Sequence, residues 1–282
     1  MTEKIALNGE EIERYKRRLR AEERSEATAE KYVRNITLYG KRLNGKAATK
    51  ESAIEWKEEL IKSGCAPETI NACLAAVNKL FAYHNKPWKL KYVHVQRKTY
   101  RDDSRDLSRA EYDRLLETLK KDNKKKRLSL IIETICSTGI RASELKYITV
   151  EAVNKREAEI SLKGKTRTVL LPEALCRKLL KYISDKGIKR GTIFITRNKT
   201  PIDRRQIWSE MKKAGIQANI KGSKVYPHNL RHLFARTFYG ISKDIAKLAD
   251  VLGHSSVDTT RIYLISTGTE HRHTLDKMRL VS

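Results

Sequence analysis

One stretch, residues 227–264, constrains the fold of this chain more than any other. Pro227 suits the first turn of a helix, where its missing N–H costs nothing. The apolar residues that follow recur at helical spacing, and they are Leu230, Leu233, Phe234 and Phe238. This pattern predicts a helix with one buried face, so the stretch must pack against a larger helical core.

The second half of this stretch contains its own start and stop signals. A second helix is expected from Ser242, and Gly253 is expected to end it in the left-handed conformation that glycine adopts cheaply. Ser255 and Asp258 have the spacing of a capping box. A third helix should therefore begin at once and carry Tyr263.

The polar residues of the same stretch are suited to phosphate chemistry. His228 and Arg231 are three residues apart, which places them on one face of a helix, and His254 follows the expected helix stop. An imidazole can transfer protons, and a guanidinium can grip two phosphate oxygens. The phenol of Tyr263 can attack as a covalent nucleophile.

These residues resemble the signature boxes of a known family, the tyrosine recombinases, also called phage integrases. The resemblance lies in LRH preceded by a histidine at the H-x-x-R spacing, in LGHSS, and in TTRIYL with its tyrosine. The family's first box, T-G-[LI]-R-x-S-E-L, is matched by residues 138–145. The four boxes occur in the family's order and imply a mainly α-helical fold with a small antiparallel β-sheet.

The resemblance implies the catalytic residues Arg141, Lys163, His228, Arg231, His254 and Tyr263. Arg141 is expected at the start of a short helix after Gly139, although it could merely pair with Glu144. The family's lysine lies at the tip of a hairpin, here expected over residues 158–172. The turn is about one residue shorter than the family's, so Lys163 is favoured and Lys165 stays as the alternative.

The remaining histidines and one short segment are given no catalytic role, and no metal site is expected. His232, His271 and His273 match no catalytic position and are expected to be surface or supporting residues. Residues 192–196 are interpreted as a short strand. The histidines lack the H-E-x-x-H and Cys/His spacings of zinc sites, and no acidic cluster suggests a two-metal nuclease. We therefore expect no metal and no cofactor.

Charge narrows the class of partner. The chain has 282 residues, with 60 Lys and Arg against 34 Asp and Glu, for a formal net charge of +26. A field of that sign attracts polyanions. On charge alone a ribosome-associated or generally basic protein is the alternative. With the four boxes, the expected partner is double-stranded DNA carrying recombination sites.

The cysteines and the hydropathy indicate a compartment. Cys65, Cys73, Cys136 and Cys176 form no C-x-x-C pair and are expected to be free thiols in a reducing cytosol. No signal peptide and no apolar run of about 18 residues is present, so we expect a soluble, cytoplasmic protein without a membrane partner.

Two domains are expected, joined by a basic linker. Residues 1–88 should form a helical core-binding domain with helices over 10–24, 27–42, 51–63 and from 67, the third burying Ile54, Leu60 and Ile61. By charge alone this bundle could bind protein instead of DNA. Residues 89–106 are expected to be the linker, and residues 107–282 the catalytic domain with a C-terminal helix. The resemblance implies that the two domains close on DNA as a clamp.

The resemblance also implies a reaction. The tyrosine would form a 3′-phosphotyrosyl bond and release a 5′-hydroxyl, and rejoining through a Holliday junction would need neither ATP nor metal. A homotetramer on DNA is expected, with a monomer or dimer in the free state. The chain starts close to the first helix, so an additional arm-binding domain is not expected. The alternatives are a catalytically vestigial DNA-binding regulator and a type IB topoisomerase-like relaxer.

Overall fold

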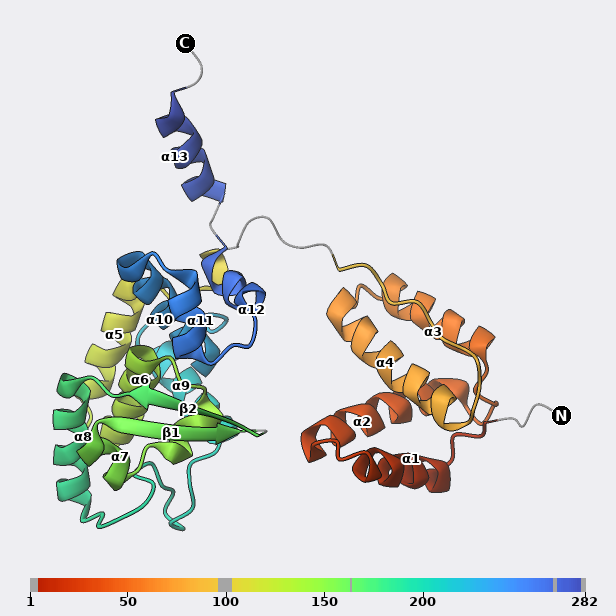
Figure 1. Cartoon of the computed structure of the whole chain (residues 1–282), viewed down its shortest axis with the longest axis horizontal. Helices are drawn as coiled ribbons and strands as arrows, with labels where there is room; N and C mark the ends of the chain where they lie inside the picture. Colours follow the sequence, from red (N-terminus) through yellow and green to blue (C-terminus); the bar gives the residue numbers. More distant parts are fainter. Residues whose placement is uncertain (1–4, 96–102, 163, 266–267, 280–282) are drawn as a thin grey trace. The chain divides into compact units, whose positions relative to one another are not determined.

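The chain divides into two compact units, Met1–Arg97 and Lys98–Ser282, each with its own hydrophobic core (Figure 1). The computed structural model describes residues 5–95, 103–162, 164–265 and 268–279. Within them, helices dominate and a single two-stranded antiparallel sheet is present. The prediction of a mainly α-helical chain with a small antiparallel sheet is therefore confirmed.

Unit 1 is a bundle of four helices. They are α1 (Gly9–Ala21), α2 (Glu26–Leu43), α3 (Lys50–Lys62) and α4 (Pro67–Tyr83). Helix α2 contacts each of the other three. The helix α4 supplies most of the core because its apolar residues recur at helical spacing, and the buried ones include Ile70, Leu74, Val77, Leu80 and Phe81.

The buried face of α3 differs from the prediction. Ile54 and Ile61 are 38% and 48% exposed, whereas Trp56 is only 5% exposed. The Trp56 ring stacks on Tyr39 of α2 with 4.9 Å between centroids. An indole buries more apolar area than an isoleucine, so the helix is turned to seat the indole and the two isoleucines face outward.

The first part of the expected linker packs against unit 1. The side-chain amide of Asn78 donates to the carbonyl of Leu90 at 3.1 Å and accepts from its N–H at 2.8 Å. Asn71 makes the same pair of bonds with Val93, at 2.9 and 2.8 Å. The two asparagine side chains thus satisfy the backbone groups of Leu90 and Val93, as a neighbouring strand would. Residues as far as Val93 therefore belong to the packed bundle.

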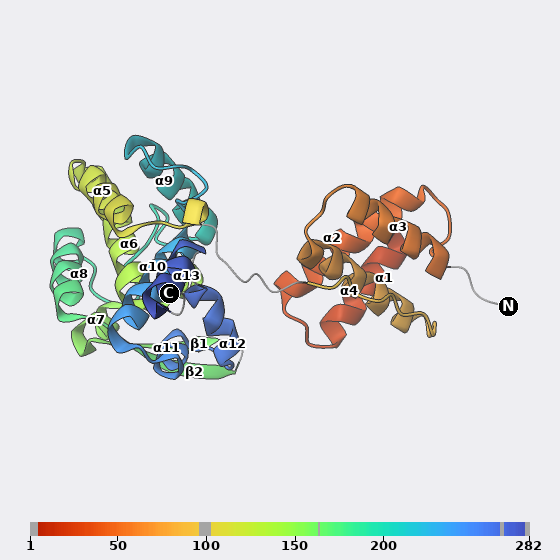
Figure 2. The same ribbon diagram turned by 90° about the horizontal axis from the view of Figure 1, so that it is seen from above.

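Unit 2 is built around one buried helix. Its helices are α5 (Arg109–Lys120), α6 (Lys126–Thr138), α7 (Val150–Lys155), α8 (Glu173–Lys186), α9 (Arg204–Gln217), α10 (Pro227–Ser242), α11 (Ile245–Leu252), α12 (Val257–Arg261) and α13 (Gly268–Met278). Helix α6 contacts α5, α8, α9 and α10 and lies among them in Figure 2. Eight of its thirteen residues are buried, as a central helix requires, and among them are Leu130, Ile131, Ile132 and Ile135.

The sheet of unit 2 is the predicted hairpin. Strand β1 (Glu157–Leu162) pairs antiparallel with β2 (Lys165–Leu170), and Ile160 lies opposite Arg167. The prediction of a strand over residues 192–196 is wrong. Thr192 and Ile195 form isolated bridges to two different segments, at Thr149 and at Pro201. Because the partner changes between them, no continuous ladder can form.

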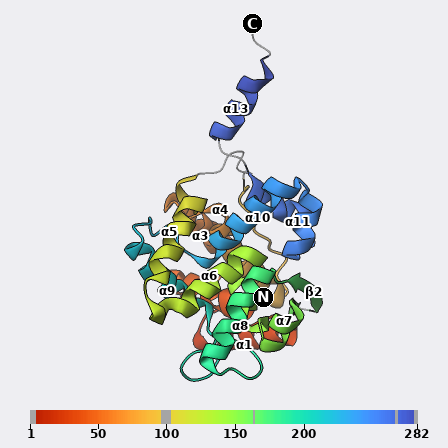
Figure 3. The ribbon, with the colours of Figure 1, turned by 90° about the vertical axis from the view of Figure 1, so that its left-hand side faces the viewer.

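Two helix starts near the C-terminus also differ from the prediction. Ser242 is the last residue of α10, and α11 begins at Ile245 because the side chain of Asp244 accepts a hydrogen bond from its first turn. The cap of α12 is Ser256 rather than Ser255. Helices α10 and α11 are in contact and lie side by side in Figures 1 and 3.

Some expectations concern features of the whole chain. All four cysteines are free thiols, with Cys73 and Cys176 buried and the other two partly buried. No described helix has both the length and the apolar composition needed to cross a membrane. Among the described residues, no group of three or more His, Cys, Asp or Glu side chains is placed to hold a metal ion.

Candidate active site

Arg231 lies at the centre of the site and is only 1% exposed. Its Nη1 donates to the carbonyl of Gly139 at 2.5 Å, and its Nη2 donates to the carbonyl of Leu252 at 2.8 Å. These carbonyls belong to the C-terminal ends of α6 and α11, where unpaired oxygens and the helix dipole favour a cation. The guanidinium therefore joins three helices in the DNA-free chain.

The charge of Arg231 survives its burial. Desolvation, together with the nearby Arg141, lowers the pKa of Arg231 to about 10, while Tyr263 and Glu144 act in the opposite direction. At neutral pH the group is still a cation. The site consequently holds a buried positive charge beside the tyrosine.

His254 is held in one tautomer. Gly253 ends α11 with a φ of +66°, as predicted, and the His254 N–H closes the cap on the carbonyl of Ala249 at 2.9 Å. Its Nε2 lies 2.9 Å from Nη2 of Arg231, which can only donate, so Nε2 must accept. The proton is then on Nδ1, which donates to Oγ1 of Thr260 at 2.8 Å.

Both candidate histidines are neutral near pH 7. Burial, aided by Arg231 and Arg141, lowers the pKa of His254 to about 4. Burial and the same two arginines also lower the pKa of His228. Cations disfavour a second positive charge beside them. His228 is therefore available as a proton acceptor.

Tyr263 lies against three imidazoles. Its side chain, in the short 3-10 helix Ile262–Leu264 (η4), is buried, with 6% exposed. Its ring centroid is 5.7 Å from that of His228, 4.5 Å from His232 and 5.6 Å from His254. The structure thus brings together four candidates, His228, Arg231, His254 and Tyr263, from α10 to η4.

His232 belongs to this cluster, although it matches no catalytic position of the family boxes. Its ring meets that of His228 edge to face, with 4.8 Å between centroids. His232 follows His228 by four residues, which is one helical turn, and this spacing could have indicated the shared face. His271 and His273 also match no catalytic position. His273 is exposed, and the side chain of His271 lies outside the described part.

Arg141 lies where the sequence predicts, at the start of the 3-10 helix Ala142–Tyr147 (η3). Gly139 ends the preceding helix with a φ of +68°, and a Cβ there would meet the Phe234 ring at 2.4 Å. Arg141 pairs with Glu144 at 2.9 Å, and its side chain is still 41% exposed. It borders a pocket of about 840 Å³ that His254 also lines.

The lysine assignment stays a prediction. Lys163 lies outside the described residues. Lys165 opens β2 opposite Leu162, and its side chain also lies outside the described part. Between them Gly164 has a φ of +74°, which is the conformation expected in a tight hairpin turn.

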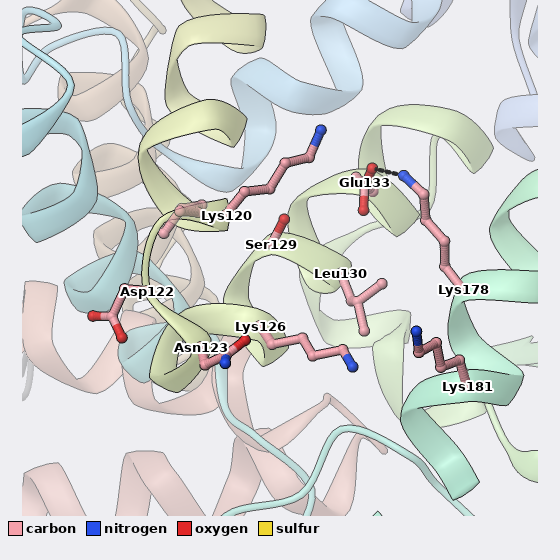
Figure 4. Close-up of a pocket in the computed structure, with 10 residues that line it drawn as sticks. Lys120, Asp122, Asn123, Lys126, Ser129, Leu130, Glu133, Lys178 and Lys181 are labelled. Atoms are coloured by element: carbon pink, nitrogen blue, oxygen red, sulfur yellow. Dashed lines mark hydrogen bonds and ion pairs between the residues drawn. The ribbon is translucent and has the colours of Figure 1, made fainter. Parts of the chain in front are cut away.

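A second hollow, of about 270 Å³, lies between α5, α6 and α8 (Figure 4). It is lined by lysines that include Lys120, Lys126 and Lys181, but it shares no residue with the pocket beside Arg141. Figure 4 shows Lys178 reaching Glu133, so part of its charge is neutralised. Surface lysines without a convergent nucleophile or base do not form an active site.

Comparisons with known proteins assign both units to one family. Residues 105–270 match the phage integrase family, and residues 12–86 match the phage integrase N-terminal SAM-like domain. Tyrosine recombinase XerA of Pyrococcus furiosus is 25% identical over 282 residues, which cover 98% of this chain and 96% of that protein.

Two solved structures share the fold. The recombinase XerH bound to its difH substrate has a TM-score of 0.69 at 18% identity, covering 95% of this chain and 84% of that chain. A lambda integrase tetramer bound to a Holliday junction has a TM-score of 0.72 at 17% identity, covering 92% and 77%. The phage integrase match spans more than half of the chain. The chain therefore belongs to the phage integrase family and is a tyrosine recombinase, an enzyme that breaks and rejoins DNA.

Proposed function

We propose that this protein is a site-specific recombinase that cuts DNA through Tyr263 and rejoins it to a partner duplex. The observation that carries the proposal is the packing of the Tyr263 ring among His228, His232 and His254, beside the buried cation of Arg231. A phenol is a weak nucleophile until its proton leaves, and this cluster supplies both an acceptor for the proton and positive charge.

The cleavage step follows from these groups. The Tyr263 oxygen attacks phosphorus and gives its proton to neutral His228. Arg141 and Arg231 stabilise the charge that builds on the non-bridging oxygens. The bond to the 5′-oxygen breaks, and that oxygen takes a proton from Lys163, or from Lys165. A 3′-phosphotyrosyl bond and a free 5′-hydroxyl remain.

Binding a phosphate must change the contacts of Arg231 and His254. In the free chain Nε2 of His254 accepts from Arg231, so it has no proton to offer. A phosphate that takes Nη2 of Arg231 frees this nitrogen, and its negative charge favours a protonated imidazole. His254 then donates to the phosphate oxygen while Nδ1 stays on Thr260.

Rejoining needs no ATP, because the phosphotyrosyl ester keeps the phosphodiester's free energy. Attack by the 5′-hydroxyl of a partner strand reverses the first step and releases Tyr263. We propose that two duplexes exchange strands through a Holliday junction in a homotetramer that assembles from free monomers or dimers. The lambda integrase tetramer on a Holliday junction, which shares the fold, supports this assembly.

The remaining assignments follow from the substrate. We propose that the helical bundle, which extends beyond the expected residues 1–88 to Val93, and residues 107–282 both bind the duplex, with the basic residues between them contacting phosphates. The reaction as derived involves no cofactor or metal. Since its substrate is DNA, we place the enzyme in the cytoplasm with the chromosome.

Covalent trapping tests the proposal. The protein and its Tyr263→Phe variant are incubated with a pool of nicked duplexes of random sequence, because a nick lets the cut fragment diffuse away. Covalent DNA–protein complexes are separated on a denaturing gel, treated with protease and sequenced. We expect a protease-sensitive band with the wild type alone, enriched in one sequence.

Each other outcome contradicts part of the proposal. A band with both proteins excludes Tyr263 as the nucleophile. Tight binding of DNA without a band favours the regulator. A band without sequence preference, together with relaxation of supercoiled DNA and no exchange between two duplexes, favours the topoisomerase-like enzyme.

A further inference from the structure

Glu144 is a buried carboxylate shared by two arginines. It is fully buried and accepts from the backbone N–H of Arg141 at 2.7 Å and from Nη1 of Arg141 at 2.9 Å. Nη1 and Nη2 of Arg167 donate to the same carboxylate at 3.3 and 2.8 Å. A buried charge is tolerated only when it is paired and hydrogen-bonded. Here one anion meets two cations.

The two arginines differ in exposure. The side chain of Arg167 is 17% exposed and places both terminal nitrogens on Glu144. That of Arg141 is 41% exposed and bonds Glu144 through Nη1 alone. All three residues line the 840 Å³ pocket, and their side chains together carry one net positive charge. The more exposed of the two guanidiniums is that of Arg141.

We propose that Arg167 is a positioning residue for DNA cleavage: it balances the charge of Glu144, so that this carboxylate does not offset the positive charge of Arg141 and the open edge of Arg141 stays available to the scissile phosphate. This inference rests on the proposed function, in which Arg141 stabilises the phosphate in the transition state. Arg167 itself does not touch the phosphate, because its fork is occupied by Glu144. Its effect passes through Arg141.

The surroundings of Arg167 support a positioning role. Gly253 lies so close that a Cβ there would be 2.5 Å from Cδ and Nη1 of Arg167. The charge of Arg167 also contributes to the lowered pKa of His254. One side chain on β2 therefore contacts the η3 carboxylate and the turn that presents His254. It lies on the hairpin whose turn contains the candidate lysine.

The test uses duplexes selected by covalent trapping, and it compares Arg167→Gln with Arg167→Lys. We expect Arg167→Gln to lower the cleavage rate by about 10- to 100-fold, as when a side chain that orients a metal ligand is removed. DNA affinity should change little. Arg167→Lys keeps the charge but loses the bidentate fork, so an intermediate rate is expected. Arg127→Gln is the control, since Arg127 pairs with Glu210 away from the pocket and should leave cleavage unchanged.

Two further measurements separate charge delivery from a simple packing role. A methylphosphonate at the scissile position removes the negative charge of the phosphate, so the Arg167→Gln defect should shrink on that substrate. An equal defect on both substrates would overturn the proposal. In Glu144→Gln/Arg167→Gln the buried anion is also gone, so the positive charge of Arg141 is no longer offset and the cleavage rate should rise above that of Arg167→Gln. A rate in the double variant no better than in Arg167→Gln would contradict the inference.

The wild type and the folding controls keep the outcomes distinct. No covalent band from wild type contradicts the proposed function itself. A band from wild type with an undiminished rate in Arg167→Gln contradicts the positioning role alone. Arg167→Gln could fail to fold because Glu144 is left without its partner. In that case the cleavage rates of Arg167→Lys and of the double variant are compared with the wild type, after thermal unfolding has shown that both variants fold.

Discussion

At the scale of single residues, Gly253 meets two constraints at once. Its φ is +66°, and a Cβ would lie 2.5 Å from two atoms of Arg167. A long side chain can usually move aside, but both terminal nitrogens of Arg167 are bound to the buried Glu144. Strain from the backbone and overlap with a fixed neighbour therefore combine at this position.

We expect Gly253→Ala to lower the free energy of unfolding by about 2–4 kcal/mol, from left-handed strain and overpacking together. Gly187→Ala is the matched control, since Gly187 has a φ of +62° and nothing within 4 Å of its Cβ position. It should lose about 1 kcal/mol, from the backbone alone. Urea unfolding measures the free energy lost by each variant. Equal losses would show that the Arg167 side chain moves aside without cost.

The protonation of His254 predicts a pH dependence of stability. Burial and three arginines lower its pKa to about 4, against about 6.5 in an unfolded chain. Between these values the unfolded chain binds more protons, so the free energy of unfolding should fall as the pH drops from about 6.5 to about 4. His254→Gln should show a flatter profile in urea unfolding across that window. Identical slopes in the two proteins would mean that His254 is not held neutral.

At the scale of elements, the segment that carries Tyr263 is short. Helix α12 has 5 residues, too few to be stable alone, and η4 continues from it. It packs against α10 and α11, and two hydrogen bonds also hold it. The side chain of Ser256 accepts from the N–H of Asp258 at 3.2 Å, and Thr260 accepts from His254 at 2.8 Å. The position of the nucleophile therefore depends on a cap and on the candidate active site itself.

Removing that cap should affect cleavage more than overall stability. Ser256→Ala deletes one capping bond, worth about 1 kcal/mol, and should slow formation of the covalent complex while DNA affinity stays unchanged. Ser108→Ala removes the corresponding cap of α5, far along the chain, at a similar cost. Single-turnover rates on the selected duplex provide the comparison. If both variants cleave at the wild-type rate, the cap does not control the tyrosine.

At the scale of the whole molecule, the two units have separate cores, and the tryptophans report on them unequally. Trp56 is 5% exposed and Trp88 packs against the core of unit 1, whereas Trp208 of unit 2 is 50% exposed. Tryptophan fluorescence should thus follow the unfolding of unit 1. Far-UV circular dichroism should follow the helices of both units.

We expect the two signals to give different urea midpoints for the DNA-free chain, because each unit can unfold by itself. A fragment of residues 1–97 should reproduce the fluorescence transition of the full chain. Coincident midpoints for both probes, together with a fragment that does not fold, would show that the units form one cooperative structure.

The sequence alone determined what depends on a few neighbouring residues. The helical period located α4, α8 and α10, and Gly139 and Gly253 ended their helices where glycine permits a positive φ. The boxes indicated Arg141, His228, Arg231, His254 and Tyr263 because chemistry of this kind requires fixed residue types at fixed spacing. Where two local signals competed, as at Ser242 and Ser255, the sequence prediction was off by one to three residues.

The tertiary structure decided what depends on segments far apart in the chain. Trp56 took the inner face of α3 because Tyr39 of another helix offers it a stacking partner. Arg167 reaches Glu144 across 23 residues, and Arg231 reaches the carbonyl of Gly139 across 92. Periodicity shows which side of a helix is apolar, but only packing determines which distant charge balances a buried carboxylate or which ring meets the tyrosine.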